Sequence, residues 1–149
     1  MNDKTANEAL VETLDEMLFE MARQAMRTAY VPYSHYAVGA CLLADDGRTF
    51  TGCNVENASY GATICAERTA LVKAVSEGAR RFDAIAIAAR DSAPYPCGIC
   101  RQVLNEFSPR MRVLVTWSGE TAETPRTVQT TLDALLPNSF GPESLGERP

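Results

Sequence analysis

The sequence has no cluster of basic residues and no long apolar run. Its formal net charge is −5, and Lys and Arg are scattered. A nucleic-acid partner is not expected, because binding to phosphates needs a basic face. No stretch approaches the roughly 20 apolar residues of a membrane span, so no membrane partner is expected. The start, Met-Asn-Asp-Lys-Thr, lacks the pattern of a signal peptide, and we expect a cytoplasmic protein.

Histidine is also scarce, with His35 as the one residue of its type. The five cysteines are an odd number. Without an export signal, they fit a reducing cytoplasm and metal binding better than disulfides. Apolar residues make up 46% of the chain and charged residues 22%, as in ordinary soluble domains. The 149 residues suit a single domain, residues 1–149, that buries a substantial core.

The pattern of apolar and turn-forming residues predicts alternating helices and strands. Thr5-Ala6-Asn7-Glu8 is typical of a capping box, so we expect a helix from Thr5 to about Tyr30. Asp45-Asp46-Gly47 predicts a hairpin turn. The other expected elements are strands 36–44, 48–55, 84–89, 111–117 and 127–130, and helices 65–77, 97–107 and 131–136. This order indicates a three-layer α/β domain with one mixed sheet.

Cys65-Ala66-Glu67-Arg68 brings a thiol, a carboxyl group and a guanidinium into four positions. Thr63 is a suitable N-cap and no Gly or Pro follows Cys65 before Gly78, so a helix is expected to begin here. The free N–H groups and dipole of a helix start favour an anion, which should lower the pKa of Cys65. Glu67 can reach the space beyond the helix end, and Arg68 shares a face with Cys65.

A second group, Pro96-Cys97-Gly98-Ile99-Cys100, places two more cysteines at another predicted helix start. Three cysteines at two helix starts suggest one soft metal ion, most plausibly zinc, with three protein ligands. A catalytic site of this kind leaves the fourth position to water. It also gives Glu67 a role, because a carboxylate beside a ligand is where a general base would be placed.

Two other interpretations stay open on the residues alone. Cys97 and Cys100 could form a redox dithiol, although that leaves Cys65 and Glu67 without a role. A structural zinc site would be closed by a fourth ligand. The candidates for that ligand are Cys41, Cys53 and His35.

Charge gives Arg68 a possible role at the metal. Three thiolates on Zn²⁺ leave a net charge of −1, which makes bound water a weaker acid than at an all-histidine site, where its pKa is about 7. Arg68 and two helix N-termini would compensate that charge. The alternative for Arg68 is a surface ion pair with Glu67 or Glu77.

C-x-E followed by P-C-x-x-C is a variant of the zinc-deaminase pattern. Further matching segments are 33–36, 52–60, 96–102 and Phe140-Gly141-Pro142. Together they resemble the small, homotetrameric, zinc-dependent cytidine deaminases over about residues 10–145. The resemblance implies an α/β/α sandwich with a mixed five-stranded sheet. It also implies hydrolytic deamination of cytidine and 2′-deoxycytidine to uridine and 2′-deoxyuridine, with release of ammonia, in pyrimidine salvage.

The resemblance further implies roles for single residues at a small-molecule nucleoside site. Cys65, Cys97 and Cys100 would hold Zn²⁺, and Glu67 would be the proton shuttle. The substrate contacts would be Asn54 and Glu56 to the ribose 3′-hydroxyl, the Ala66 backbone to the base, and the ring of Tyr36 against the pyrimidine.

The family's homotetramer implies sites shared between subunits, with Tyr60 and Phe140 reaching a neighbour's site. Tyr36 is a departure, because the family more often has Phe there, and a buried hydroxyl needs a partner. A related substrate, such as an aminonucleoside antibiotic, is a rival hypothesis, although Asn54, Glu56 and the segment 140–142 favour cytidine. A zinc-stabilised binding module without activity is another.

Overall fold

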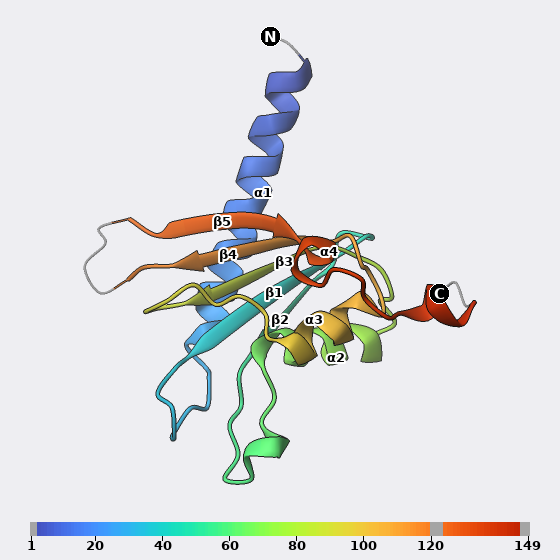
Figure 1. Cartoon of the computed structure of the whole chain (residues 1–149). Helices are drawn as coiled ribbons and strands as arrows, with labels where there is room; N and C mark the ends of the chain where they lie inside the picture. Colours follow the sequence, from blue (N-terminus) through green and yellow to red (C-terminus); the bar gives the residue numbers. More distant parts are fainter. Residues whose placement is uncertain (1–2, 120–123, 147–149) are drawn as a thin grey trace.

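The computed structural model describes residues 3–119 and 124–146. A five-stranded sheet has helices on both faces (Figure 1). The helices are α1 (Asp3–Met26), α2 (Ala66–Ser76), α3 (Gly98–Asn105) and α4 (Leu132–Leu135), with 3₁₀ turns η1 (Tyr60–Ala62) and η2 (Pro142–Leu145). The strands are β1 (Val38–Ala44), β2 (Thr49–Cys53), β3 (Phe82–Ala89), β4 (Arg112–Trp117) and β5 (Arg126–Thr131).

The strands lie in the order β2-β1-β3-β4-β5. β3 and β4 are parallel, and the other neighbouring pairs are antiparallel. α3 lies between β3 and β4 in the chain, so it is the crossover that a parallel pair requires. α1 covers one face of the sheet, and α2 and α3 cover the other (Figure 1). The predicted α/β/α sandwich with a mixed five-stranded sheet is therefore confirmed.

β3 is the central strand and is buried on both faces. Ala84, Ala86 and Ala88 pack in the core beneath α1, whereas Ile85 and Ile87 pack in the core beneath α2 and α3. Successive side chains of a strand point to opposite faces. The alternation of small and branched residues in the sequence therefore places alanine methyl groups in one core and isoleucine side chains in the other.

Two glycines let helices lie against the sheet without a side chain between the backbones. A Cβ at Gly39 would lie 2.0 Å from the carbonyl oxygen of Ala22 in α1. A Cβ at Gly52 would lie 2.4 Å from the amide nitrogen of Ala70 and 2.6 Å from the carbonyl oxygen of Ala66. Gly52 therefore sets how closely the first turns of α2 approach β2.

The ends of two helices differ from the prediction for one physical reason. Val55, just beyond β2, forms isolated bridges with both Tyr30 and Ile64. The Tyr30 bridge draws the chain into an extended conformation, so α1 ends at Met26 and not near Tyr30. The Ile64 bridge delays α2 until Ala66, so Thr63 is not its N-cap.

The start of α1 also differs from the prediction. The helix begins at Asp3, so Thr5 lies inside it and the predicted capping box is not its start. The hairpin turn between β1 and β2 is confirmed, with Gly47 at φ 84°. The remaining helices and strands occur in the predicted order, with their ends shifted by a few residues. Within the described ranges, no helix is both long and apolar enough to cross a membrane.

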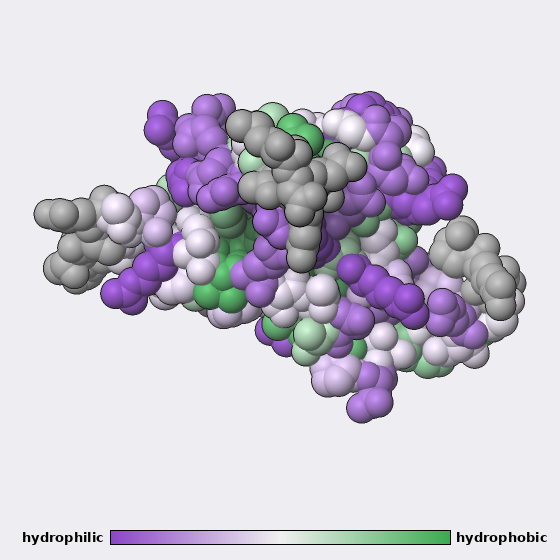
Figure 2. All heavy atoms as spheres, turned by 90° about the horizontal axis from the view of Figure 1, so that it is seen from above, coloured by the Kyte–Doolittle hydropathy of each residue, from purple (hydrophilic) through white to green (hydrophobic). Residues whose placement is uncertain are grey.

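A groove of about 420 Å³ lies between the first half of α1 and strands β4 and β5. Figure 2 shows this side of the molecule, with hydrophobic side chains visible between hydrophilic ones. Its lining combines carboxylates such as Glu12 with apolar side chains such as Phe19 and Leu114. None of the candidate site residues from the sequence lies in this lining.

Replacing Gly52 with Ala should lower the free energy of unfolding by about 1–3 kcal/mol, because the new methyl group overlaps the α2 backbone. Urea denaturation measures the change. Gly61→Ala is the matched control, because an added Cβ there meets nothing within 4 Å. Equal stability of the two variants would contradict the close packing of α2 on β2.

Candidate metal centre

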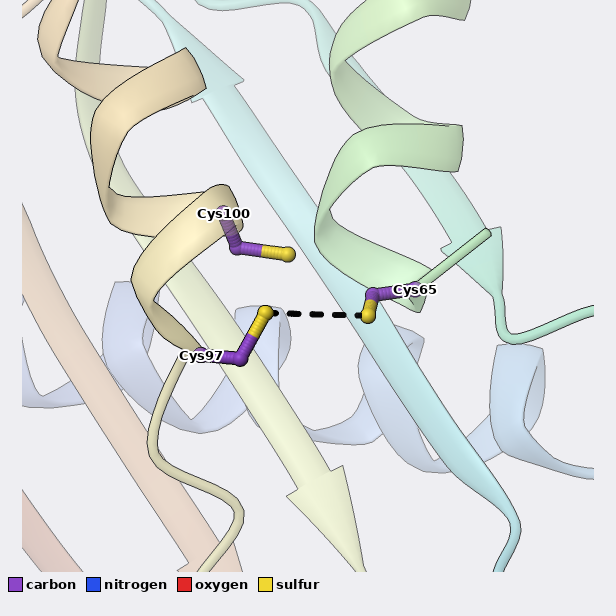
Figure 3. Close-up of side chains that lie close together, drawn as sticks. All are labelled: Cys65, Cys97 and Cys100. Atoms are coloured by element: carbon purple, nitrogen blue, oxygen red, sulfur yellow. Dashed lines mark hydrogen bonds between the residues drawn. The ribbon is translucent and has the colours of Figure 1, made fainter. Parts of the chain in front are cut away.

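Two cysteines occupy the N-cap positions of two helices. Cys65 precedes α2 and Cys97 precedes α3, and both have extended backbones. Neither thiol caps its own helix, so both side chains are free to point into the space in front of the helix starts. Cys100 joins them from the first turn of α3 and is buried. Figure 3 shows the three side chains converging from the two helices.

The three sulfur atoms lie within 4.8 Å of one another. The Sγ atoms of Cys65 and Cys97 are 3.9 Å apart. Tetrahedral zinc with Zn–S bonds of about 2.3 Å separates its sulfur ligands by roughly 3.8 Å. The spacing and the sulfur chemistry therefore fit a zinc ion.

The candidates for a fourth ligand lie elsewhere. Cys41 is buried in β1 with its Sγ 3.8 Å from the sulfur of Met21. The thiol of Cys53 donates to the carbonyl oxygen of Thr28. Among the described residues, the metal-binding group contains the three cysteines and no further His, Cys, Asp or Glu, and His35 is not part of it. This arrangement supports an open coordination position over a closed structural site.

The pKa values of the Cys65 and Cys100 thiols shift in opposite directions. The neighbouring Cys100 thiol, followed by the Arg68 guanidinium, lowers the pKa of Cys65 to about 5. The same interaction with Cys65 raises the pKa of Cys100, and burial adds to the increase. Cys65 is therefore the first of this pair to become a thiolate, the form that binds metals.

Arg68 lies close enough to Cys65 and Cys100 for both to raise the pKa of its guanidinium. Its Nη2 donates to the carbonyl oxygen of Thr63 at 2.9 Å. Its Nε is buried without a hydrogen-bond partner. Such a group is costly unless an acceptor is supplied, and ionised ligand sulfur would supply one. In the described part of the chain Arg68 forms no ion pair with Glu67 or Glu77, so the surface-pair alternative is wrong.

Glu67 lies in the first turn of α2 and is 4% exposed. Burial is the main cause that raises the pKa of its carboxyl group to about 7, and the charge of Cys65 acts in the same direction. A carboxyl group with this pKa can both accept and donate a proton near neutral pH. Ala66, which separates Glu67 from Cys65, is fully buried.

Glu56 lies at a pocket of about 400 Å³, lined by Tyr33, Ser34, Glu56, Tyr60 and Thr63. Its carboxylate accepts hydrogen bonds from the Ser34 hydroxyl and from the backbone N–H groups of Tyr33 and Ser34. The hydrogen bond from Ser34 is the largest cause that lowers the pKa of Glu56. The carbonyl oxygen of Thr63 also accepts the hydrogen bond from Arg68, which links the pocket to the start of α2, although none of the three cysteines lines it.

Asn54 and Tyr36 are fixed by neighbours that the sequence did not indicate. The Asn54 amide accepts from the Val38 N–H at 2.9 Å and donates to the Tyr36 carbonyl oxygen at 2.8 Å. The hydroxyl of Tyr36 lies 3.2 Å from the Ser92 carbonyl oxygen and 3.1 Å from its Oγ. The extra hydroxyl of Tyr36 therefore has partners within the chain.

Tyr60 and Phe140 are candidate residues with large, exposed aromatic side chains. Their exposed fractions are 76% and 62%. Tyr60 borders the pocket, with its ring 6.1 Å from that of Tyr33. The Phe140 backbone is attached to α3 through Gln102 and Asn105, two residues for which the sequence indicates no role.

Thiolates are soft ligands that suit zinc. With three of them gathered at two helix starts, this layered α/β domain is a zinc-binding protein. Residues 12–116 match the family model described as the cytidine and deoxycytidylate deaminase zinc-binding region. The chain therefore belongs to the cytidine and deoxycytidylate deaminase family.

Similar proteins cover most of the chain. A cytidine deaminase of Sporosarcina psychrophila is 47% identical over 133 residues, which are 87% of this chain and 93% of that protein. One from Mycobacterium tuberculosis is 45% identical over 130 residues, 87% of this chain and 91% of that protein. The crystal structure of cytidine deaminase from Burkholderia pseudomallei has a TM-score of 0.75 and 44% identity, covering 84% of this chain and 98% of that one.

Arg68→Gln should weaken zinc retention, activity or both, because the thiolates lose their nearest positive charge. Loss of such an outer-shell partner costs about 10–100-fold in metal affinity or activity. Zinc content after dialysis against a graded chelator measures the first effect. Arg81→Gln, at a side chain that is 78% exposed, is the control. If the two variants behave alike in zinc content and activity, Arg68 has no role at the metal.

Proposed function

We propose that this protein is a zinc-dependent cytidine deaminase, which hydrolyses cytidine and 2′-deoxycytidine to uridine and 2′-deoxyuridine and releases ammonia. The observation that carries the proposal is a three-thiol cluster beside a buried, protonatable Glu67. Relatives at 45–47% identity are named cytidine deaminases. The acidic chain suits a neutral nucleoside better than a phosphorylated substrate, which would need cations.

The proposed metal ligands are Cys65, Cys97 and Cys100. When bound, zinc supplies the Lewis acidity that activates water at neutral pH. Arg68 and the N-termini of α2 and α3 offset the negative charge that three thiolates bring. This positive charge helps to keep the three ligand sulfur atoms ionised.

Glu67 is the proposed proton carrier. It accepts a proton from the attacking water and delivers it to N3 of the cytosine ring, which makes C4 more electrophilic. The hydroxide that remains adds to C4. Glu67 would then move the proton of the new C4 hydroxyl to the amino group, so that the C4–N bond breaks, ammonia leaves and the oxygen stays on C4 as the carbonyl of uridine. A carboxyl pKa of about 7 suits both transfers, because neither protonation state is strongly favoured.

The proposed substrate contacts bind the ribose and the base of the nucleoside. The free oxygen lone pairs of Glu56 and the second Nδ2 hydrogen of Asn54 would bind the ribose 3′-hydroxyl. The backbone of Ala66 would contact the base, and the ring of Tyr36 would stack on it. Asn54 and Glu56 are already oriented by the backbone of segment 33–38, so little side-chain freedom is lost when the nucleoside binds.

We further propose a homotetramer that acts in pyrimidine salvage in the cytoplasm. Two exposed aromatic residues, Tyr60 and Phe140, support shared sites, because each would gain a partner in an assembly. Five free cysteines support a reducing compartment.

The direct test follows the loss of cytidine ultraviolet absorbance together with ammonia release. Activity should disappear with a chelator and return when zinc is added. Full activity in a protein freed of zinc, or no reaction of the zinc-loaded protein with cytidine or 2′-deoxycytidine, would contradict the proposal. A reversible Cys97–Cys100 disulfide without deamination would favour a redox protein.

Glu67→Gln should retain zinc and lose activity by several orders of magnitude, because each proton-transfer role contributes about 10²–10⁴-fold. The amide has the same shape but carries no transferable proton. Glu77→Gln, at an exposed residue just beyond the same helix, serves as the control. Turnover near that of the control would remove Glu67 from the mechanism.

Sedimentation equilibrium should show an assembly of four chains, and Phe140→Ala should raise the KM for cytidine because the neighbour's site loses an apolar contact. Burial of one aromatic side chain is worth about 1.5–3 kcal/mol, roughly 10–150-fold in binding. An active monomer would refute the shared site.

A further inference from the structure

Side chains of α3 bind backbone groups of the C-terminal segment. Arg101 donates to the carbonyl oxygen of Leu135 at 2.8 Å. Gln102 and Asn105 both donate to the carbonyl oxygen of Phe140, at 2.9 and 3.4 Å. The segment that carries Phe140 is thus attached to α3 at two places along its length.

The hydrogen bonds at Asn105 require a side-chain amide, which can donate and accept at the same time. It is 3% exposed. Its Nδ2 donates to the Phe140 carbonyl oxygen, while its Oδ1 accepts from the Ser139 hydroxyl at 3.2 Å. A carboxylate in its place would set an oxygen against that carbonyl oxygen. A Cβ at Gly141 would lie 2.9 Å from the same Nδ2, so the backbone passes Asn105 without room for a side chain.

The attachment runs along α3 from Gln102, two residues beyond the ligand Cys100, to the end of the helix at Asn105. Cys97 precedes the helix and Asn105 is its last residue, which separates them by about 12 Å at 1.5 Å per residue. The Phe140 ring is 62% exposed, and it does not line the pocket at Glu56. Phe140 therefore has a fixed backbone and an exposed side chain that contributes nothing to the pocket at Glu56 of its own chain.

We propose that Gln102 and Asn105 are positioning residues, which fix the Phe140 backbone relative to α3 and so set how the ring enters the site of another copy. This inference rests on the proposed deaminase function and on the proposed shared site. It adds that α3 joins two sites: Cys97 and Cys100 at its start would hold the metal of one, and Gln102 and Asn105 position an aromatic contact for the other.

The test measures kcat and KM for cytidine, zinc content and sedimentation in Gln102→Glu, Gln102→Met and Asn105→Asp. KM should rise about tenfold, as expected when a hydrogen bond that orders a contact is lost. Zinc content and assembly should be unchanged, and kcat should change less than KM. Gln102 is exposed, so its variants should fold even if Asn105→Asp does not. Gln129→Glu, on exposed β5, is the control.

A double-mutant cycle with Phe140→Ala identifies the route of the effect. If the two residues act through Phe140, their substitution adds nothing to KM once the ring is absent. A KM that stays at the wild-type value in all three variants, or that rises equally in the Phe140→Ala background, would overturn the inference. Failure of the proposed function is a separate result, because the wild-type protein would then not deaminate cytidine.

Discussion

The site depends on balancing negative charge within a small volume. Three sulfur atoms within 4.8 Å of one another repel when ionised, and a buried carboxyl group lies beside them. The N-termini of α2 and α3 and the guanidinium of Arg68 bring positive charge to the same region. The balance is uneven: the pKa of Cys65 falls while that of Glu67 rises. One group is thereby suited to hold a cation and its neighbour to carry a proton.

The placement of these groups depends on extended pairing around Val55. Its bridge to Ile64 keeps the chain out of the helix until Cys65, so this cysteine becomes the N-cap and its thiol lies in front of the helix. Its bridge to Tyr30 fixes the start of the segment that orients Glu56 and Asn54. A short stretch beyond β2 thus fixes both the position of Cys65 and the segment that lines the pocket at Glu56.

Local patterns were sufficient to predict the layered fold, the two helix starts and the convergence of three cysteines. They failed where distant backbone pairing overrides propensity, as at Tyr30 and Thr63, which would otherwise suit a helix end and a cap. They also gave no sign of Ser34 or Ser92, which lie 22 and 56 residues from the Glu56 and Tyr36 groups they contact. An ordinary serine has no local feature that marks it as a partner, so such contacts emerge only from the folded chain.

The two-sided packing of β3 has a consequence for how the sequence can vary in length. Alanines face α1 and isoleucines face the opposite layer. Inserting or deleting one residue within β3 would exchange these faces along the rest of the strand. Bulky groups would then press on the helix that lies closest, and voids would open beneath the helices that bear the cysteines. We therefore expect insertions and deletions to be tolerated in the connections and not in β3, whose register with β1 and β4 is fixed by its two buried faces.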